Sequence, residues 1–251
     1  MFDITTIGTA SIDTFLELED IIPYTDAKTK SLRYSFPLGE KVAVKTVEEH
    51  FGGNAMNTAI GLQRLKVKTA IITALGNCAK CSSVKAHLAK EKVEIGYIKT
   101  SDKSELNKSF ILDWRKDKSD RVILSYHQQK NFSNLQFPKT KFFYLTSLGA
   151  HFQSVCAQIP KTARLIINPG GVELAHSDEL LLPLLEKTEA LILNKTEAAH
   201  LIMVDPISTS PEFMMSHILA LGCSTVVITC GKNGAYAREK NDAHAFFAKS
   251  I

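Results

Sequence analysis

The residues best suited to chemistry lie in the stretch HFGGNAMNTAIGL, residues 50–62. Gly52 and Gly53 come directly before Asn54 and Asn57, at the start of a run with helical periodicity. A helix N-terminus presents unpaired N–H groups and the positive end of the helix dipole, and glycines let a ligand come close to the backbone. Asparagine amides donate and accept hydrogen bonds at once, as hydroxyl groups do. The stretch therefore favours a site for a hydroxyl-rich ligand, although a glycine turn with Asn54 as the helix cap explains the same residues.

A carboxylate follows the first predicted strand. Residues 3–10, DITTIGTA, have the pattern of a strand, and Asp13 comes just after them in GTASIDTF. A carboxylate can accept hydrogen bonds from two neighbouring hydroxyls, so Asp13 suits the same kind of ligand. A turn residue is the alternative interpretation, because aspartate is also common in turns.

Two further stretches follow buried strands later in the chain. In ALILNKTEAAHLI, Asn194 ends a strand and Glu197 follows three residues later, which is also the spacing of a capping box. In VVITCGKNGAY, Thr229 and Gly231 end a strand, and a turn through Gly234 leads into another. By itself this second stretch indicates only a hairpin turn.

Strand-like and helix-like segments alternate along the chain. Most of the predicted strands are short, nearly continuous apolar runs, which are typical of strands buried in a parallel sheet. With short connections, this order predicts an α/β fold: a doubly wound, mostly parallel sheet with helices on both faces. The predicted strands are residues 3–10, 69–75, 141–147, 163–168, 189–194 and 224–230, and the predicted helices are residues 55–65, 82–92, 152–159, 177–187, 195–203 and 211–221.

Two stretches, at about residues 15–49 and 108–127, interrupt this alternation. The first contains SLRYSFPLGEKVAVKTV, which alternates like half-exposed strands joined at a Pro-Leu-Gly turn. The second contains KSFILDW and RVILSYH around a polar turn, which predicts a hairpin. Such strands usually cover something on one side, so we expect a small β lid over a site. An additional edge sheet without a function is the alternative.

Composition excludes several other classes of protein. The chain has 251 residues and a formal net charge of +4, and its lysines are mixed with acidic residues, so we expect no nucleic-acid partner. No apolar run approaches membrane-spanning length, and the first residues lack the pattern of a signal peptide. We therefore expect a single domain over residues 1–251, without a membrane partner.

The five cysteines indicate reduced thiols and a cytoplasmic location, because their number is odd and most lie in or beside apolar or helical segments. Cys78 and Cys81 form a C-x-x-C pair. A structural zinc site would need two more ligands at similar spacing, and no second C-x-x-C exists. A redox role would need the pair to open a helix after a strand. A chance pair in a loop is the plainer interpretation.

Taken together, the motifs resemble a known family. The pattern G-G-N-A-x-N-x-A after a β lid resembles the first signature of the ribokinase-like (PfkB) family of sugar and nucleoside kinases. The resemblance continues into TAIITALG, where Gly76 has the spacing of the family. Lys66 departs from it, because the family usually has glycine or serine there; the departure affects a helix C-cap more than a ligand contact.

The resemblance implies ATP and Mg²⁺ as cofactors and a role for each motif. Asp13, Gly52, Gly53, Asn54 and Asn57 would bind the sugar or nucleoside. The N-x-x-E motif, Asn194 and Glu197, would help to hold magnesium and the nucleotide phosphates, with Glu197 acting on the metal through water. The T-x-G-x-x-G motif, Thr229, Gly231 and Gly234, would lie beside the adenine nucleotide.

The most specific motif of the family, a G-A-G-D run whose aspartate is the general base, does not occur. The look-alikes LGAHF and GGVE come too early and lack the aspartate. We therefore expect a domain that is incomplete at its C-terminus. The predicted activity is ATP-dependent phosphorylation of a hydroxyl of a sugar, sugar phosphate or nucleoside, with the catalytic-base segment missing. A non-catalytic relative that binds a sugar or nucleoside, or a protein partner, is the alternative. A homodimer through the β lid is a further hypothesis.

Overall fold

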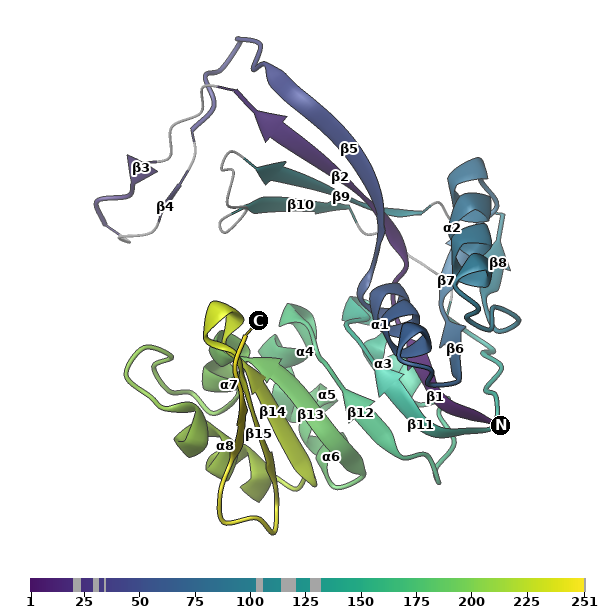
Figure 1. The fold of residues 1–251 in the computed structure, drawn as a ribbon, viewed down its shortest axis with the longest axis vertical. Coiled ribbons are helices and arrows are strands. Elements are labelled where there is room, and N and C mark those ends of the chain that lie inside the picture. Colours follow the sequence, from purple (N-terminus) through teal and green to yellow (C-terminus); the bar gives the residue numbers. More distant parts are fainter. Residues whose placement is uncertain are drawn as a thin grey trace.

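A large sheet forms the centre of the molecule in the computed structural model (Figure 1). Its eight strands lie in the order β16-β15-β14-β13-β12-β11-β1-β6, and the last six of these are parallel. The structure describes residues 1–19, 24–28, 32–33, 35–102, 106–113, 121–126 and 132–250. The strands are β1 (Phe2–Ile7), β6 (Thr69–Ile72), β11 (Thr140–Leu145), β12 (Leu165–Ile167), β13 (Thr188–Asn194), β14 (Thr225–Thr229), β15 (Ala235–Glu239) and β16 (Phe246–Ala248).

Both faces of this sheet carry helices, as the apolar runs predict. Ile71 and Ile72 are neighbours in β6, and both are fully buried, but they belong to different hydrophobic clusters. Successive side chains of a strand point to opposite faces, so each isoleucine reports a separate core. On one face lie α1 (Asn54–Arg64) and α2 (Ala79–Lys90); the other cluster includes α3 (Phe152–Cys156), α4 (Gly171–Ala175), α6 (Leu182–Leu185), α7 (Lys195–Leu201) and α8 (Pro211–Ala220), with α5 (Ser177–Leu180) beside them.

The strand order reverses direction beside β1. After β1, the chain returns through α1 to β6 on one side, whereas β11 and all later strands of the sheet lie on the other side. Ligands of open α/β sheets bind outside the carboxyl ends of the strands at such a switch point. From the topology we therefore expect a ligand site at the loops that follow β1 and β11.

A second, four-stranded sheet forms the lid, and its order is β10-β9-β2-β5. β2 pairs with β5 in an antiparallel manner and with β9 in a parallel manner, and β9 and β10 form the predicted hairpin. Figure 1 shows the lid standing off the edge of the main sheet at which α1 begins. Its strands are β2 (Ser11–Leu18), β5 (Val44–Gly52), β9 (Asn107–Asp113) and β10 (Val122–Tyr126).

The pairing around the Pro-Leu-Gly turn differs from the prediction. β5 pairs with β2, and β4 (Leu32–Arg33) pairs with β3 (Tyr24–Thr25), so the strands on either side of the turn do not pair with each other. The first lid strand, β2, begins at Ser11, which is before the predicted insertion at about residues 15–49. β2 gives β5 a long antiparallel partner, and the two strands pair from Ser11 to Leu18 of β2.

Two predicted elements are each divided in the structure. The strand at residues 69–75 stops at Thr73, and its continuation β7 (Ala74–Gly76) pairs with β8 (Lys99–Ser101) in a separate two-stranded sheet. The helix at residues 177–187 is divided into α5 and α6 near Pro183, which lies at the start of α6. Proline lacks an N–H group, so it suits a first helical turn and not an interior one.

Lysines occupy left-handed positions that glycine usually fills. Lys66 follows α1 with a φ of 65°, and its N–H group donates to the carbonyl of Gln63 at 2.9 Å. Lys92 follows α2 with a φ of 63° and repeats this contact with Ala89. These are Schellman-type helix ends. The unusual Lys66 of the sequence is thus a helix C-cap position, as predicted.

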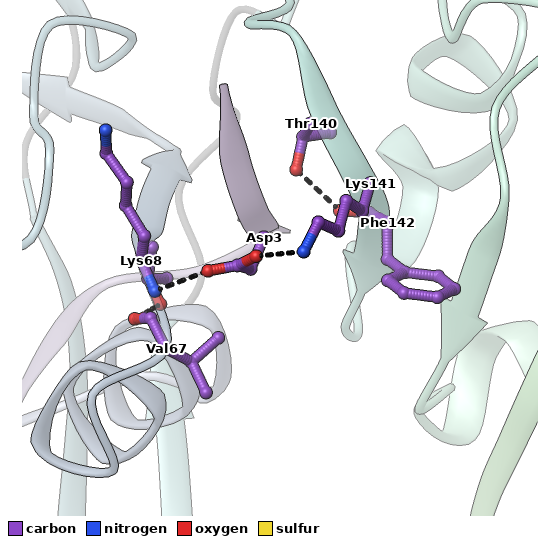
Figure 2. A network of polar contacts seen from close by, with 7 residues as sticks. Asp3, Val67, Lys68, Thr140, Lys141 and Phe142 are labelled. Carbon is purple, nitrogen blue, oxygen red and sulfur yellow. Dashed lines mark hydrogen bonds and ion pairs between the residues drawn. The ribbon is translucent and has the colours of Figure 1, made fainter.

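Polar contacts join segments at the amino ends of the parallel strands (Figure 2). The carboxylate of Asp3 accepts a hydrogen bond from the backbone N–H of Lys68 at 3.1 Å and contacts Nζ of Lys141 at 2.6 Å. The Lys141 ammonium, together with this backbone donor, lowers the pKa of Asp3. The network ties β1 to the start of β6 and to β11, at the edge of the sheet away from the lid.

No helix in the described ranges has the length and apolar character that crossing a membrane requires.

The left-handed lysines allow a stability test. Lys92→Gly should raise the free energy of unfolding by about 0.5–1 kcal/mol, because glycine has no Cβ to strain at a positive φ. Lys90→Gly, two residues earlier and inside the exposed end of α2, should instead lower it by a similar amount, about 0.5–1 kcal/mol. Urea unfolding of the two variants and the parent chain measures both changes. Equal effects of the same sign would contradict this account.

Candidate functional site

A cavity of about 710 Å³ lies between the lid and the carboxyl edge of the main sheet. The topology brings four of the predicted site residues into its wall: Asp13 from β2, Gly53 before α1, and Asn54 and Asn57 from the first turn of α1. Thr9 and Ser147, which follow β1 and β11, complete its floor. The cavity therefore lies at the topological switch point.

Asp13 is a strand residue, so the interpretation as a turn residue is wrong. In the lid sheet it lies directly between His50 of β5 and Ser109 of β9. The hydroxyl of Ser11 donates a hydrogen bond to its Oδ1 at 3.0 Å. This contact fixes the carboxylate while leaving it in the cavity wall, where it can accept hydrogen bonds from hydroxyl groups of a ligand.

Gly52 and Gly53 are required by close packing. A Cβ atom on Gly52 would lie 2.1 Å from Oδ2 of Asp13, so any other residue would displace this carboxylate. Gly53 has a φ of 97°, and a Cβ atom there would lie 2.5 Å from the carbonyl oxygen of Thr9. Because glycine has no Cβ atom, it avoids the close contact at both positions and adopts the positive φ of Gly53 without strain. Gly52 thus shapes the site from beneath Asp13, outside the cavity wall.

Asn54 does not cap α1, so this interpretation of the sequence is also wrong. The helix begins at Asn54, its N-cap is Gly53, and no side chain makes the cap hydrogen bond. Asn54 and Asn57 are both exposed and lie three residues apart, hence on the same side of the helix. Both residues line the cavity, and their role in binding a hydroxyl-rich ligand stays a prediction.

Sequence reasoning missed the contribution of the lid strands. His50, Ser109 and Ser125 line the cavity on the same face as Asp13, because each is paired in register with its neighbour across the sheet. Alternation along each strand identified two faces, but it could not show which face of one strand would meet which face of another. Register between strands that are distant in the sequence was the missing information.

Asn194 and Glu197 form the capping box that their spacing predicted. The Asn194 side chain accepts from the backbone N–H of Glu197 at 2.8 Å, and the Glu197 carboxylate accepts from the N–H of Asn194 at 2.8 Å. Asn194 ends β13, and it pairs in register with Thr229 at the end of β14. A capping role does not exclude contact with a nucleotide, and the predicted nucleotide role stays a prediction.

The T-x-G-x-x-G stretch forms the predicted hairpin turn. Gly231 begins the single-turn helix η2 (Gly231–Asn233), and Gly234 follows it, both with positive φ. The antiparallel strand β15 starts directly afterwards. Thr229 and these glycines therefore lie at the same edge of the sheet as Asn194, beside β13 and away from the lid cavity.

Two intervening strands separate the lid cavity from the group formed by Asn194, Thr229, Gly231 and Gly234. Between β1 and β13 lie β11 and β12, so the strands are three spacings of about 4.8 Å apart, or roughly 14 Å. The loops after β11 and β12 fill the edge between them. The cavity and the predicted nucleotide residues thus lie on one edge of one sheet, at different strands.

A buried glutamate that the sequence analysis passed over joins those two loops. Glu173 is fully buried, and its carboxylate accepts hydrogen bonds from the N–H groups of Leu148 at 2.8 Å, Gly149 at 2.7 Å and Gly170 at 2.9 Å. The hydroxyl of Ser147 lies 3.4 Å away. In the sequence, GGVE stands out only as a look-alike of the absent G-A-G-D run. In the structure, its glutamate holds the loop after β11 against the loop after β12.

Cys78 and Cys81 lie at the start of α2, after β7, so the expected loop location is wrong for Cys81. Cys78 is the N-cap of α2, and its sulfur accepts a hydrogen bond from the N–H of Cys81 at 3.2 Å. The Cys81 side chain is buried, and burial raises the pKa of its thiol. A raised pKa opposes formation of the reactive thiolate.

Among the described residues, no group of three or more His, Cys, Asp or Glu side chains is placed to hold a metal ion.

The fold and the cavity define a class: doubly wound α/β domains whose β lid covers a cavity at the carboxyl edge of the sheet. The chain belongs to the pfkB family of carbohydrate kinases, because the sequence model of this family, "pfkB family carbohydrate kinase", matches residues 17–249. This match confirms the family that the motifs resemble.

Known relatives agree with this placement. The chain is 25% identical to a nucleoside kinase of Methanocaldococcus jannaschii over 159 residues, which are 62% of this chain and 52% of that relative, about half its length. It is 23% identical to a ribokinase of Staphylococcus aureus over 98% of this chain and 78% of the relative. Among solved structures, a ribokinase from Cryptococcus neoformans var. grubii serotype A in complex with ADP aligns over all of this chain and 79% of that one. Its TM-score is 0.74, at 14% identity.

The role of Glu173 can be measured through stability. Glu173→Gln should lower the free energy of unfolding by about 2–3 kcal/mol. The amide replaces one carboxylate oxygen with an N–H₂ group, so either the N–H groups of Leu148 and Gly149 or the N–H group of Gly170 would lose their acceptor. The exposed Glu179, on the following helix, provides the matched control: Glu179→Gln should change stability by no more than about 0.5 kcal/mol. Denaturant unfolding gives both values. Similar small effects in both variants would show that the buried contacts do not hold the loops.

Proposed function

We propose that the chain serves ATP-dependent phosphorylation of a hydroxyl group on a sugar, sugar phosphate or nucleoside. One observation carries the proposal: Asp13, Asn54 and Asn57 face a single cavity at the switch point, beneath the lid. A carboxylate and two amides at the start of a helix suit a ligand whose hydroxyls donate and accept hydrogen bonds. Membership of the pfkB family supports the same reaction class.

The second subsite suits the nucleotide. Phosphoryl transfer depends on positioning and on stabilising charge, and bound Mg²⁺ would supply charge neutralisation on the phosphates. We assign Asn194 and Glu197 to the phosphate and magnesium side, with Glu197 acting through water. Thr229, Gly231 and Gly234 would contact the rest of the nucleotide. The structural relative crystallised with ADP supports a nucleotide at this fold.

A competing function is binding without catalysis. The family's G-A-G-D run, which carries the general base, is not found in residues 1–251, and we propose that these residues contain the binding subsites without that segment. A non-catalytic relative that binds the same ligands would then show thermal stabilisation by ligand without ATP turnover. The two functions share the lid cavity and differ in turnover alone.

We also propose a homodimer through the lid and a cytoplasmic location. The lid face away from the cavity exposes apolar side chains, among them Val47 at 63%, Phe110 at 39% and Leu124 at 53%. A contiguous exposed apolar patch favours association, and a second lid would cover it with the same chemistry. All five cysteines are free thiols, which fits a reducing compartment.

Ligand binding tests the proposed acceptor site. A panel of pentoses, hexoses and nucleosides, titrated by isothermal calorimetry, should contain a ligand that binds the parent chain. Asp13→Ala should weaken its affinity about tenfold or more, because a hydrogen bond to a charged group is lost. Thr14→Ala, the next residue and on the opposite face of β2, should leave the affinity unchanged. Adding ATP and magnesium and measuring ADP release separates catalysis from binding alone.

Two results would contradict the acceptor site. One is that no member of the panel binds. The other is that Asp13→Ala and Thr14→Ala have the same affinity, which would place the ligand outside the lid cavity.

The lid dimer has a separate test. Phe110→Asp should convert a dimer into a monomer in light scattering coupled to gel filtration, because it places a charge in the apolar patch. Ile207→Asp changes a side chain that is 88% exposed and away from the lid, so it should leave the dimer intact. A monomeric parent chain at all concentrations would show that the lid does not associate.

A further inference from the structure

The lid presents its side chains to the cavity in rows that the strand register sets. The inner row is His50, Asp13, Ser109 and Ser125, one residue from each of the four strands, paired directly across the sheet. The outer row is Glu48, Phe15, Ile111 and Ile123, paired in the same way one step further along the strands. All eight residues line the cavity.

The two rows differ in chemistry. Every member of the inner row carries a hydrogen-bonding group, whereas three of the four members of the outer row are large and apolar. Two residues along a strand advance about 6.6–6.8 Å, so the apolar row lies about that far beyond the polar one. The inner row is nearer to the main sheet, because β2 leaves the sheet just before Ser11 and β5 returns to it at Gly52.

The apolar surface of the outer row is available to a ligand. Ile111 is only 4% exposed, so packing within the lid explains it. Ile123 is 49% exposed, and Phe15 is half-buried, with its ring edge-on to the His50 ring at 5.3 Å between centroids. Phe15 and Ile123 therefore form an apolar wall above the polar row.

A ligand that fills both rows has hydroxyls at one end and a flat apolar-faced group at the other. A free pentose would satisfy the inner row and leave Phe15 and Ile123 facing water. We propose that the acceptor is a nucleoside, with its ribose on the inner row and its base against the outer row. This inference rests on the proposed function and selects one of the substrate classes that it allows.

The charged residues of the cavity wall also favour a nucleoside over a sugar phosphate. Two carboxylates, those of Asp13 and Glu48, line it, and Arg121 is the one lysine or arginine among its described lining residues. A sugar phosphate would bring further negative charge into this wall, which like-charge repulsion disfavours. Glu48 stands at the end of the outer row, where its Oε2 lies 3.1 Å from Nε2 of His50. It can accept hydrogen bonds from the N–H groups of a base.

Calorimetric titration without ATP tests the inference on the full chain. The probes are D-ribose, ribose 5-phosphate and the four common ribonucleosides. At least one nucleoside should bind the parent chain about tenfold more tightly than D-ribose, because burial of the base adds apolar contact area. The measured quantity is the ratio of nucleoside affinity to ribose affinity.

Variants on adjacent positions of β10 provide a matched pair. Ile123→Ala should lower the affinity ratio severalfold, and the double variant Phe15→Ala with Ile123→Ala about tenfold. Leu124→Ala alters a side chain of similar exposure, 53%, on the opposite face of the lid, so it should leave the ratio at the parent value. Phe15→Leu, which keeps an apolar group, should retain more of the ratio than Phe15→Ala. Melting temperatures check that each variant is folded.

The outcomes separate this inference from the function on which it rests. If D-ribose or ribose 5-phosphate binds as tightly as every nucleoside, the acceptor is not a nucleoside, while the hydroxyl-binding site stands. If the nucleoside binds more tightly but the outer-row variants leave the ratio unchanged, the base does not lie on the outer row and the assignment is overturned. If none of the probes binds, the proposed acceptor site fails, and the inference fails with it.

Discussion

A steric constraint at residues 52 and 53 joins the lid to the main sheet. Neither position has room for a Cβ atom, because the Asp13 carboxylate lies over one and the Thr9 carbonyl over the other. The end of β5, the start of α1 and the passage from β1 to β2 are thereby held at one point. Since the helix begins there, its first turn and the exposed residues Asn54 and Asn57 lie beside a carboxylate. The lid cavity is a consequence of this crossing of two chain segments.

The rest of the candidate site follows from the parallel sheet. Strands that run in the same direction place all their carboxyl ends on one edge, so residues as distant in sequence as Thr9 and Asn194 share it. The loops between them would be free to vary without further restraint. Glu173 supplies that restraint by burying a carboxylate among backbone donors, an arrangement in which a missing partner is costly. The floor of the site therefore depends on one side chain that is not itself in the cavity wall.

Local sequence patterns predicted the alternating sheet and helices and the β9–β10 hairpin, whereas the joint location of Asp13, Asn54 and Asn57 was predicted from the resemblance to the PfkB family. Apolar runs and glycine signals act over a few residues, so they can be read along the chain. The pairing of β5 with β2 could not be read in this way, because cross-strand partners are chosen by tertiary packing. For the same reason the sequence did not reveal Ser109 as a neighbour of Asp13. The capping assigned to Asn54 was wrong because the close packing of Gly53 moved the helix start by one residue.

The parallel pairing of β2 with β9 has a consequence for how the molecule folds. These two strands come from opposite ends of the first half of the chain, and their contacts close a long loop. Contacts of this kind form slowly, because chain entropy is lost before they are made. The lid should thus assemble on a main sheet whose β1–β6 contacts already exist. Its amides would be among the first to open again, since few buried side chains hold β10 in place. The lid, whose side chains line the cavity, is then also the part of the molecule with the least cooperative support.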